Sequence, residues 1–279
     1  MRYSSPLSFA RTFRAILATV LVAGSAYATA IEVYGVTADG VLVRFDSATP
    51  GVLDLLILGV PGIGAGETIA GLDIRPADQK LYALTIGASS VGRLYTLNPT
   101  TGAASLVGTL SVPLSGAKFG MNFQPVVGLL RVVSDNGMNI RINPATAVVI
   151  TDTGLNPPTP HVVATAYTNS YFGAATTVLY DIDSGSDSLL IQGILSPNDG
   201  TLTAVGPLNV ATSDIAGFDI VSLDGIDAAY ATLRVGGTTG LYTVNLATGT
   251  ASFVGNVLGN LPIIGLAIAP DSIFRNGFN

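Results

Sequence analysis

One fifteen-residue segment occurs twice in this chain, and it constrains the fold more than any other feature. The first copy, LYTLNPTTGAASLVG, covers residues 94–108, and the second, LYTVNLATGTASFVG, covers residues 241–255. Ten of the fifteen positions are identical. Each copy has apolar and polar residues alternating on both sides of a turn rich in Asn, Thr and Gly, which is the pattern of a β-hairpin. The chain therefore contains a repeated β-structural unit.

Three further segments have the same shape with less similar sequences. They are LVRFDSATPGVLDLLILG, IRINPATAVVITDTG and LYDIDSGSDSLLIQG, at residues 42–59, 140–154 and 179–193. In the first copy of the repeat, Pro99 presets φ for the second position of a turn, and Gly102 can adopt a positive φ where the strand resumes. We therefore predict five hairpins.

A second repeated element precedes most of the hairpins. It reads IAGLDIRP, KFGMNFQP, IAGFDIVS and IIGLAIAP, at residues 69–76, 118–125, 215–222 and 263–270. Another strand usually follows it, such as KLYALT at residues 80–85. Each unit thus has four strands in about 45–50 residues, and an all-β repeat of that length is typical of a β-propeller. We predict an all-β fold of this kind, with a two-sheet sandwich as the alternative.

The incomplete units at the two ends of the chain complement each other. The hairpin at 42–59 has no IAGLDI-like strand before it, and the strand at 263–270 has no hairpin after it. We therefore predict a five-bladed propeller in which the C-terminal strand completes the N-terminal blade. The predicted blades are residues 263–272 with 31–60, then 69–110, 118–154, 162–208 and 215–257.

The fourth blade is the least regular unit. Its segment VVATAYTNS, at residues 162–170, is either the innermost strand or the second strand of the blade. When residues are counted back from Leu179 without gaps, Tyr167 falls opposite Tyr82 of the second blade. This register favours the second strand.

The N-terminal residues have the organisation of a secretory signal peptide. Three arginines, Arg2, Arg11 and Arg14, precede an apolar run at residues 15–24 and small residues up to Ala28. We predict cleavage after Ala28, which makes residues 1–28 a signal peptide. Residues 29–279 then form a single propeller domain, exported to the periplasm or the extracellular space.

Cleavage changes the charge of the protein. The formal net charge falls from −6 to −9, because the signal peptide contains three basic residues and no acidic residue. An acidic protein is not expected to bind nucleic acid or anionic membranes. No later segment has about eighteen consecutive apolar residues, so no membrane span is expected after cleavage. The chain has no cysteine, and its single histidine, His161, has no partner for a zinc site. No cofactor or metal site is therefore expected.

The repeated segments carry a resemblance to a known family. Together with VYGVTADGVLVRFD at residues 33–46 and RVVSDNGMNIRINP at residues 131–144, they resemble the bacterial family called domain of unknown function 4394. The resemblance covers nearly all of residues 29–279. It implies a secreted bacterial protein with propeller-like repeats, and it supplies no catalytic residues.

The innermost strands of a propeller line its central channel, so their polar residues are the candidate ligand-binding residues. Asp73, Asn122 and Asp219 occupy equivalent positions in three of these strands, and Arg75 and Gln124 lie two residues further along two of them. We predict a channel site made of these five residues for a small ligand, a cation or a sugar. The structural alternative is that such side chains hydrate the channel or bond neighbouring strands.

A hydrolase of carbohydrates or phosphoesters is the alternative function. It would need two carboxylates converging at the channel mouth, about 5–10 Å apart, and Glu67, Asp73 and Asp219 are the candidates. Repeat-equivalent residues such as Asp73 and Asp219 are more often structural, so no catalytic residue is assigned. The oxygen-rich segment at residues 181–187 aligns with a hairpin turn and lacks a full calcium-loop pattern.

We therefore predict a secreted, non-catalytic β-propeller, monomeric, that binds an unknown small ligand or surface partner or serves as a surface scaffold. The channel mouth and the loops around it are the default site, because a rigid scaffold holds such loops in place for binding.

Overall fold

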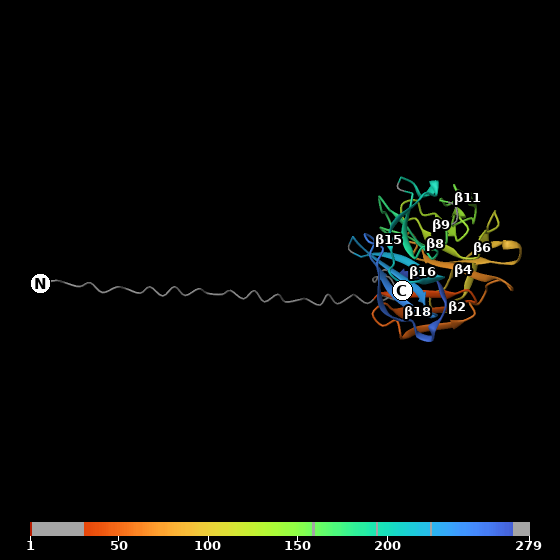
Figure 1. Ribbon diagram of the computed structural model, residues 1–279. Helices are drawn as coiled ribbons and strands as arrows, with labels where there is room; N and C mark the ends of the chain where they lie inside the picture. The colour runs from red at the N-terminus through yellow and green to blue at the C-terminus, as the bar shows by residue number, and fades with distance from the viewer. Residues whose placement is uncertain (2–30, 158–159, 194, 224, 270–279) are drawn as a thin grey trace.

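The computed structural model describes residues 1, 31–157, 160–193, 195–223 and 225–269. Apart from Met1, the predicted signal peptide at residues 1–28 lies outside the described residues. So do residues 270–272, the last ones predicted for the first blade. The described residues form five four-stranded antiparallel sheets, arranged as a five-bladed β-propeller (Figure 1). The predicted all-β fold is confirmed.

The blades are numbered in chain order, and their strands are given from the innermost to the outermost. Blade 1 has β20 (Ile263–Ala269), β1 (Glu32–Thr37), β2 (Val41–Asp46) and β3 (Leu53–Leu58). Blade 2 has β4 (Thr68–Ile74), β5 (Leu81–Ile86), β6 (Gly92–Leu97) and β7 (Ala104–Thr109). Blade 3 has β8 (Phe119–Phe123), β9 (Leu130–Ser134), β10 (Asn139–Ile142) and β11 (Val149–Thr151). Blade 4 has β12 (Val162–Tyr167), β13 (Leu179–Asp183), β14 (Ser188–Gln192) and β15 (Leu202–Pro207). Blade 5 has β16 (Thr212–Leu223), β17 (Ile226–Val235), β18 (Thr238–Val244) and β19 (Ala251–Asn256).

The C-terminal strand completes the N-terminal blade, as predicted. β20 pairs with β1 in antiparallel register, from Glu32 opposite Ala269 to Val36 opposite Gly265. The orange strands from the start of the chain and the blue strands from its end therefore lie side by side in Figure 1. These hydrogen bonds close the ring without a disulfide, which a chain lacking cysteine cannot form.

The preferred register of blade 4 was wrong. β12, which contains Tyr167, is the innermost strand, and the hairpin at residues 179–193 forms the second and third strands, β13 and β14. The outermost strand is β15. A gapless count fails here because a long loop, residues 168–178, separates the first strand from the second, whereas the corresponding connection in blade 2 is only residues 75–80.

The helical segments of the described chain are three single 3-10 turns, at Ala88–Ser90, Pro197–Asp199 and Leu258–Asn260. None of them has the length or the apolar character that a membrane crossing requires.

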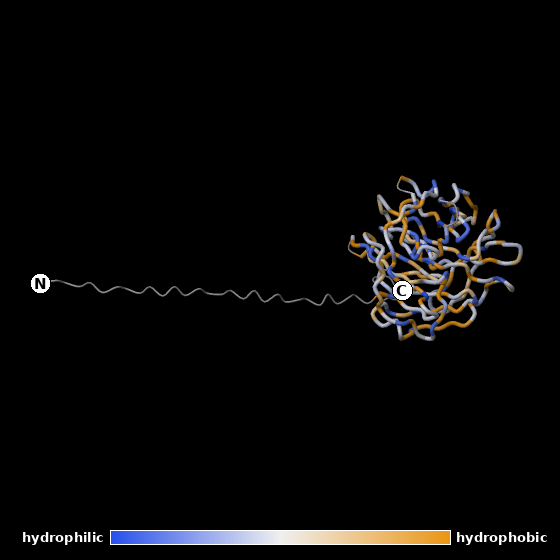
Figure 2. The backbone as a smooth tube through the Cα atoms, viewed as in Figure 1, coloured by the Kyte–Doolittle hydropathy of each residue, from blue (hydrophilic) through white to orange (hydrophobic). Residues whose placement is uncertain are grey.

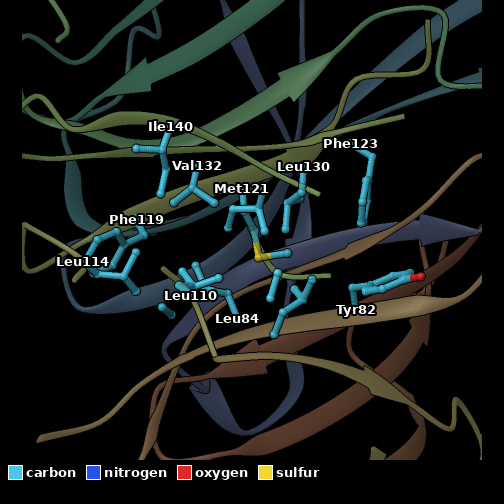
Figure 3. Packing of buried hydrophobic residues seen from close by; sticks show 14 residues of the cluster. Tyr82, Leu84, Leu110, Leu114, Phe119, Met121, Phe123, Leu130, Val132 and Ile140 are labelled. Carbon is cyan, nitrogen blue, oxygen red and sulfur yellow. The ribbon is translucent and has the colours of Figure 1, made fainter. Parts of the chain in front are cut away.

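Apolar side chains from neighbouring blades fill most of the space between the sheets. The cluster between blades 2 and 3 is shown in Figure 3, where Met121 of β8 points toward Leu84 and Leu110 of blade 2. The Tyr82 and Phe123 rings meet edge to face with their centroids 5.0 Å apart. Because each sheet is covered on both faces, the inner strand β8 is buried along its whole length. Burial of this apolar surface is the main force that holds the blades together.

Glycines allow the inner strands to approach closely at the axis. A Cβ atom at Gly120 would lie 2.7 Å from the backbone N of Thr165 in the next blade, and one at Gly217 would lie 2.9 Å from the backbone N of Leu266. A Cβ atom cannot lie so close to the backbone atoms of a packed neighbouring strand. The inner strands can therefore keep this spacing only with glycine at these positions.

We expect Gly120→Ala to destabilise the protein by about 1–3 kcal/mol, because the added methyl group overpacks a contact between two backbones. Gly51→Ala is the matched control, since its Cβ would meet only ordinary contacts, the nearest being the Asn256 carbonyl oxygen at 3.7 Å. The control should change stability by no more than about 0.5 kcal/mol. Urea unfolding of both variants measures the difference, and equal stabilities would contradict the close-packed axis.

Candidate functional site

Three of the predicted channel residues come together around the axis. Asp73, Asn122 and Asp219 lie at the same position of β4, β8 and β16, and each is at most 3% exposed. The Asn122 Nδ2 donates a hydrogen bond of 3.0 Å to the Asp219 Oδ1, which joins blade 3 to blade 5 across the axis. The Asp219 carboxylate also accepts a hydrogen bond from the backbone N of Ile268 in blade 1, at 2.7 Å.

These side chains satisfy backbone groups that the sheets leave unpaired. An innermost strand has a sheet partner on one side only, so alternate N–H groups point away from the sheet toward the axis. Five such amides, one from each blade, donate to the three side chains, at distances of 2.6–2.9 Å. They belong to Ile74, Phe123, Tyr167, Ile220 and Ile268.

The distribution of acceptors follows the blade order. Asp73 accepts from the amide after it and from Phe123 of the next blade, and Asp219 likewise accepts from its own blade and from the next. Asn122 accepts from Tyr167 of blade 4. Blades 1 and 4 carry Ala267 and Ala166 at this level, and their amides are bonded by the preceding blade. Three side chains thus serve all five blades.

Arg75 and Gln124 do not join this ring of side chains. They follow the last residues of β4 and β8, at the start of turns that lead to the second strands. The Arg75 guanidinium pairs with Asp78 at 3.0 Å and lies 6.0 Å from the centre of the Phe123 ring. The five predicted residues therefore lie at two levels of the inner strands.

The two axial carboxyl groups are held in an unfavourable environment for negative charge. Burial raises the pKa of Asp219 to about 7, against the opposing hydrogen bonds from Ile268, Ile220 and Asn122. Burial and the nearby charge of Asp219 raise the pKa of Asp73 well above its usual range. Neither carboxyl group forms an ion pair with a basic side chain of the described residues.

The axis itself offers almost no room. The cavity between the inner strands, lined by the axial glycines and their neighbours, has a volume of about 10 Å³. That is about the space that one water molecule needs. A ligand larger than water has no place at this level.

One face has a shallow pocket where the inner strands begin. This mouth pocket, of about 90 Å³, has walls of apolar side chains from several blades, including Ile69, Phe119, Val163 and Ile264. Lys118 and Asp214 lie at it and form an ion pair of 3.3 Å, with side chains 29% and 55% exposed. Both charged groups are accessible to a ligand.

The interface between blades 3 and 4 differs from the other four. Those four contain apolar clusters of at least eleven buried residues each, whereas the apolar cluster here has three, Val133, Leu155 and Val162. The rest of the blade 3–4 interface is polar. Figure 2 shows blue, hydrophilic segments in the region that Figure 1 labels β9 and β11.

Arg131 is the centre of this polar interface, and its side chain is 1% exposed. It donates to Asn139 and to Asp152 at 2.6 Å each, and to Asn198 of blade 4 at 2.6 Å. Arg141 binds the Asp152 carboxylate through two hydrogen bonds of 2.7 Å. Although burial opposes them, these arginine contacts lower the pKa of Asp152.

Two acceptors of blade 4 in the same interface have no partner among the described residues. They are Oδ2 of Asp181 and Oε1 of Gln192, and both residues are fully buried. Burial raises the pKa of Asp181 to about 7, although the Thr165 hydroxyl and the charge of Arg131 act in the opposite direction. Sequence reasoning missed this interface. The available signal was the polar residues at the centres of strands, above all Arg131 within LLRVVS.

Comparison with known proteins identifies the family. The model of the family described as "Domain of unknown function (DUF4394)" matches residues 41–267, so the chain belongs to this family. No curated protein matches the sequence at a significant level.

Some solved structures are similar to this chain at low sequence identity. An auxiliary nutrient binding protein from Bacteroides thetaiotaomicron is 10% identical with a TM-score of 0.51, and the match covers 80% of this chain and 53% of that chain. One from Bacteroides ovatus gives the same values. Glutaminyl cyclase from Myxococcus xanthus is 16% identical with a TM-score of 0.45, over 74% of this chain and 84% of that one. At such low identity, the two matches with a TM-score of 0.51 show the fold alone.

We expect stability to fall as the pH rises from about 4 to about 7. The carboxyl groups of Asp181 and Asp219 have an ordinary pKa of 3.8 when unfolded and about 7 in the native protein. The native state therefore binds more protons than the unfolded state between these pKa values. Its free energy of unfolding falls as the pH rises through this interval. The total effect is on the order of a few kcal/mol.

Urea unfolding at several pH values measures this dependence. Asp181→Asn, which resembles the protonated carboxyl group, should flatten the curve, while Asp54→Asn at an exposed position of β3 should leave it unchanged. Stability that rises between pH 4 and pH 7 would be the contrary result.

Proposed function

We propose that this member of the domain of unknown function 4394 family is an exported, non-catalytic binding module. Its ligand is a small molecule with an apolar body and a charged or polar group, held in the mouth pocket. The observation that carries the proposal is the accessible ion pair of Lys118 and Asp214 at an apolar pocket on the propeller axis.

The mouth pocket has the composition of a small-molecule site. Binding pockets combine apolar walls with a few polar groups that orient the ligand. Here apolar side chains such as Phe119 and Val163 form the walls, and Lys118 and Asp214 supply opposite charges. A ligand with a charged group can replace one member of an exposed ion pair at little cost, because such pairs contribute only about 0–1 kcal/mol.

The scaffold beneath the pocket is rigid. The inner strands that begin at the pocket are held together a few residues later by the axial hydrogen bonds and the glycine contacts. A pocket on such a base loses little conformational entropy on binding, which favours affinity.

Nothing in the described residues favours the alternative of a hydrolase at the channel. Asp73 and Asp219 are at most 3% exposed. The axial cavity, whose lining includes neither of them, has room for about one water molecule. The Glu67 carboxylate is bound by Arg93, Thr85 and Tyr95 and has little exposed surface. Carboxylates that act on a glycosidic bond must reach both sides of it.

Export is supported by the sequence of residues 1–28, which has the organisation of a signal peptide. The destination is the periplasm or the extracellular space. N-terminal sequencing of protein recovered outside the cytoplasm tests it, with Thr29 expected as the first residue.

Thermal unfolding with a panel of small carboxylates, amines and sugars tests the mouth pocket. A ligand of the native state at one hundred times its Kd should stabilise the protein by about 2.7 kcal/mol. We expect Lys118→Met or Asp214→Asn to remove the shift. Lys80→Met, at the other lysine of the chain, should preserve it, because Lys80 lies in the turn before β5.

Two results would contradict the proposal. A ligand whose shift survives both mouth-pocket variants binds elsewhere. A panel with no shift at all favours the scaffold function, in which the propeller presents its surface to a large partner.

A further inference from the structure

A second pocket lies beside blade 4, and its lining shares no residue with that of the mouth pocket. This side pocket has a volume of about 480 Å³, and its lining includes Pro160, His161, Asp183, Ser186, Leu190 and Leu202. Known small-molecule sites have volumes of about 300–1,000 Å³. The side pocket is thus large enough for an organic ligand.

A single carboxylate dominates the polar wall of the side pocket. Asp183 is 7% exposed. It accepts hydrogen bonds from the His161 amide at 2.9 Å, and from the amide and hydroxyl of Ser186 at 2.8 and 3.0 Å. No basic side chain of the described residues forms an ion pair with it. A carboxylate with this little exposure and no counter-cation is an attractive position for a positively charged group.

The imidazole of His161 forms a fixed part of the same wall. A Cβ atom at Gly185 would lie 2.9 Å from Cδ2 of His161, so the ring packs directly on the backbone of the β13–β14 turn. The Asp183 hydrogen bond to the His161 amide holds the two segments together. The shape of the pocket is therefore set before a ligand arrives, which lowers the entropic cost of binding.

The floor of the side pocket is apolar, and further acceptors lie on the same face of the sheet, next to it. Leu190 and Leu202 line the floor. In the sheet, Leu190 is paired with Asp181 and Leu202 with Gln192, the two buried residues that have unpartnered oxygens. This part of blade 4 is thus rich in hydrogen-bond acceptors. The acidic charge of the whole protein, −6 for the full chain, adds a field that attracts cations.

From these observations we infer that the side pocket binds a small organic cation, an ammonium group attached to an apolar body. The ammonium group contacts the Asp183 carboxylate, and the apolar body lies on Leu190 and Leu202. This site is separate from the mouth pocket, so the inference does not depend on the proposed function.

Isothermal titration of the full mature protein with benzylammonium tests the inference. Benzyl alcohol and benzoate are matched probes without charge and with reversed charge. We expect benzylammonium to bind, and the other two to bind at least about tenfold more weakly, since only the ammonium group both donates hydrogen bonds to the carboxylate and carries the opposite charge.

Two variants locate the binding. Asp183→Asn removes the charge and should weaken benzylammonium binding at least about tenfold. Ala204→Trp fills the pocket from an exposed position of β15 and should abolish binding with little effect on folding. Asp54→Asn and Ala65→Trp are the controls at exposed positions elsewhere, and both should bind normally. Asp214→Asn reports on the mouth pocket, because Asp214 is the anionic group there that a cation would contact.

The inference is overturned if benzylammonium does not bind, or if benzyl alcohol binds equally well. It is also overturned if Ala204→Trp leaves the affinity unchanged. Binding that is lost in Asp214→Asn and retained in Ala204→Trp would assign the cation to the mouth pocket instead.

Discussion

The ring of hydrogen bonds around the axis is the constraint on which the rest of the structure depends. Every innermost strand has backbone amides that no sheet partner can bond, and a buried amide without an acceptor costs about 1–3 kcal/mol. Asp73, Asn122 and Asp219 supply acceptors for five such amides. Most of these hydrogen bonds cross from one blade to the next. The side chains that bond the unpaired amides therefore also join the blades. Glycines two residues earlier, such as Gly120 and Gly217, let the inner strands lie close enough for these hydrogen bonds to form.

The closed axis has room for about one water molecule between the inner strands, and the polar residues there bond neighbouring strands. Larger pockets lie at the mouth and beside blade 4. The ring is also asymmetric. Four interfaces are apolar, while the interface between blades 3 and 4 contains the buried Arg131 and its hydrogen-bond partners. The side pocket adjoins blade 4, whose strands depart from the register of the repeat.

The repeats made most of the fold predictable, because each blade has its own hairpin and inner strand in the sequence. Asp73, Asn122 and Asp219 could be placed at one level because they occupy the same position of a repeated strand. Blade 4 was harder, since the loop at residues 168–178 shifts its strands relative to the repeat. The contacts of Arg131 with Asn198 join residues 67 positions apart and depend on how two blades pack, so no local pattern indicates them. The side pocket likewise forms only when the segment before β12 meets the β13–β14 turn.

Amide hydrogen exchange at Phe123, Tyr167 and Ile268 tests the axial ring most directly, because each amide donates to a side chain of the preceding blade. If the ring holds the blades together, these amides should exchange only through global unfolding, with an opening free energy equal to that of the whole protein. Exchange with a much smaller opening free energy, comparable to that of exposed loop amides, would show that the axis opens independently and would contradict the account.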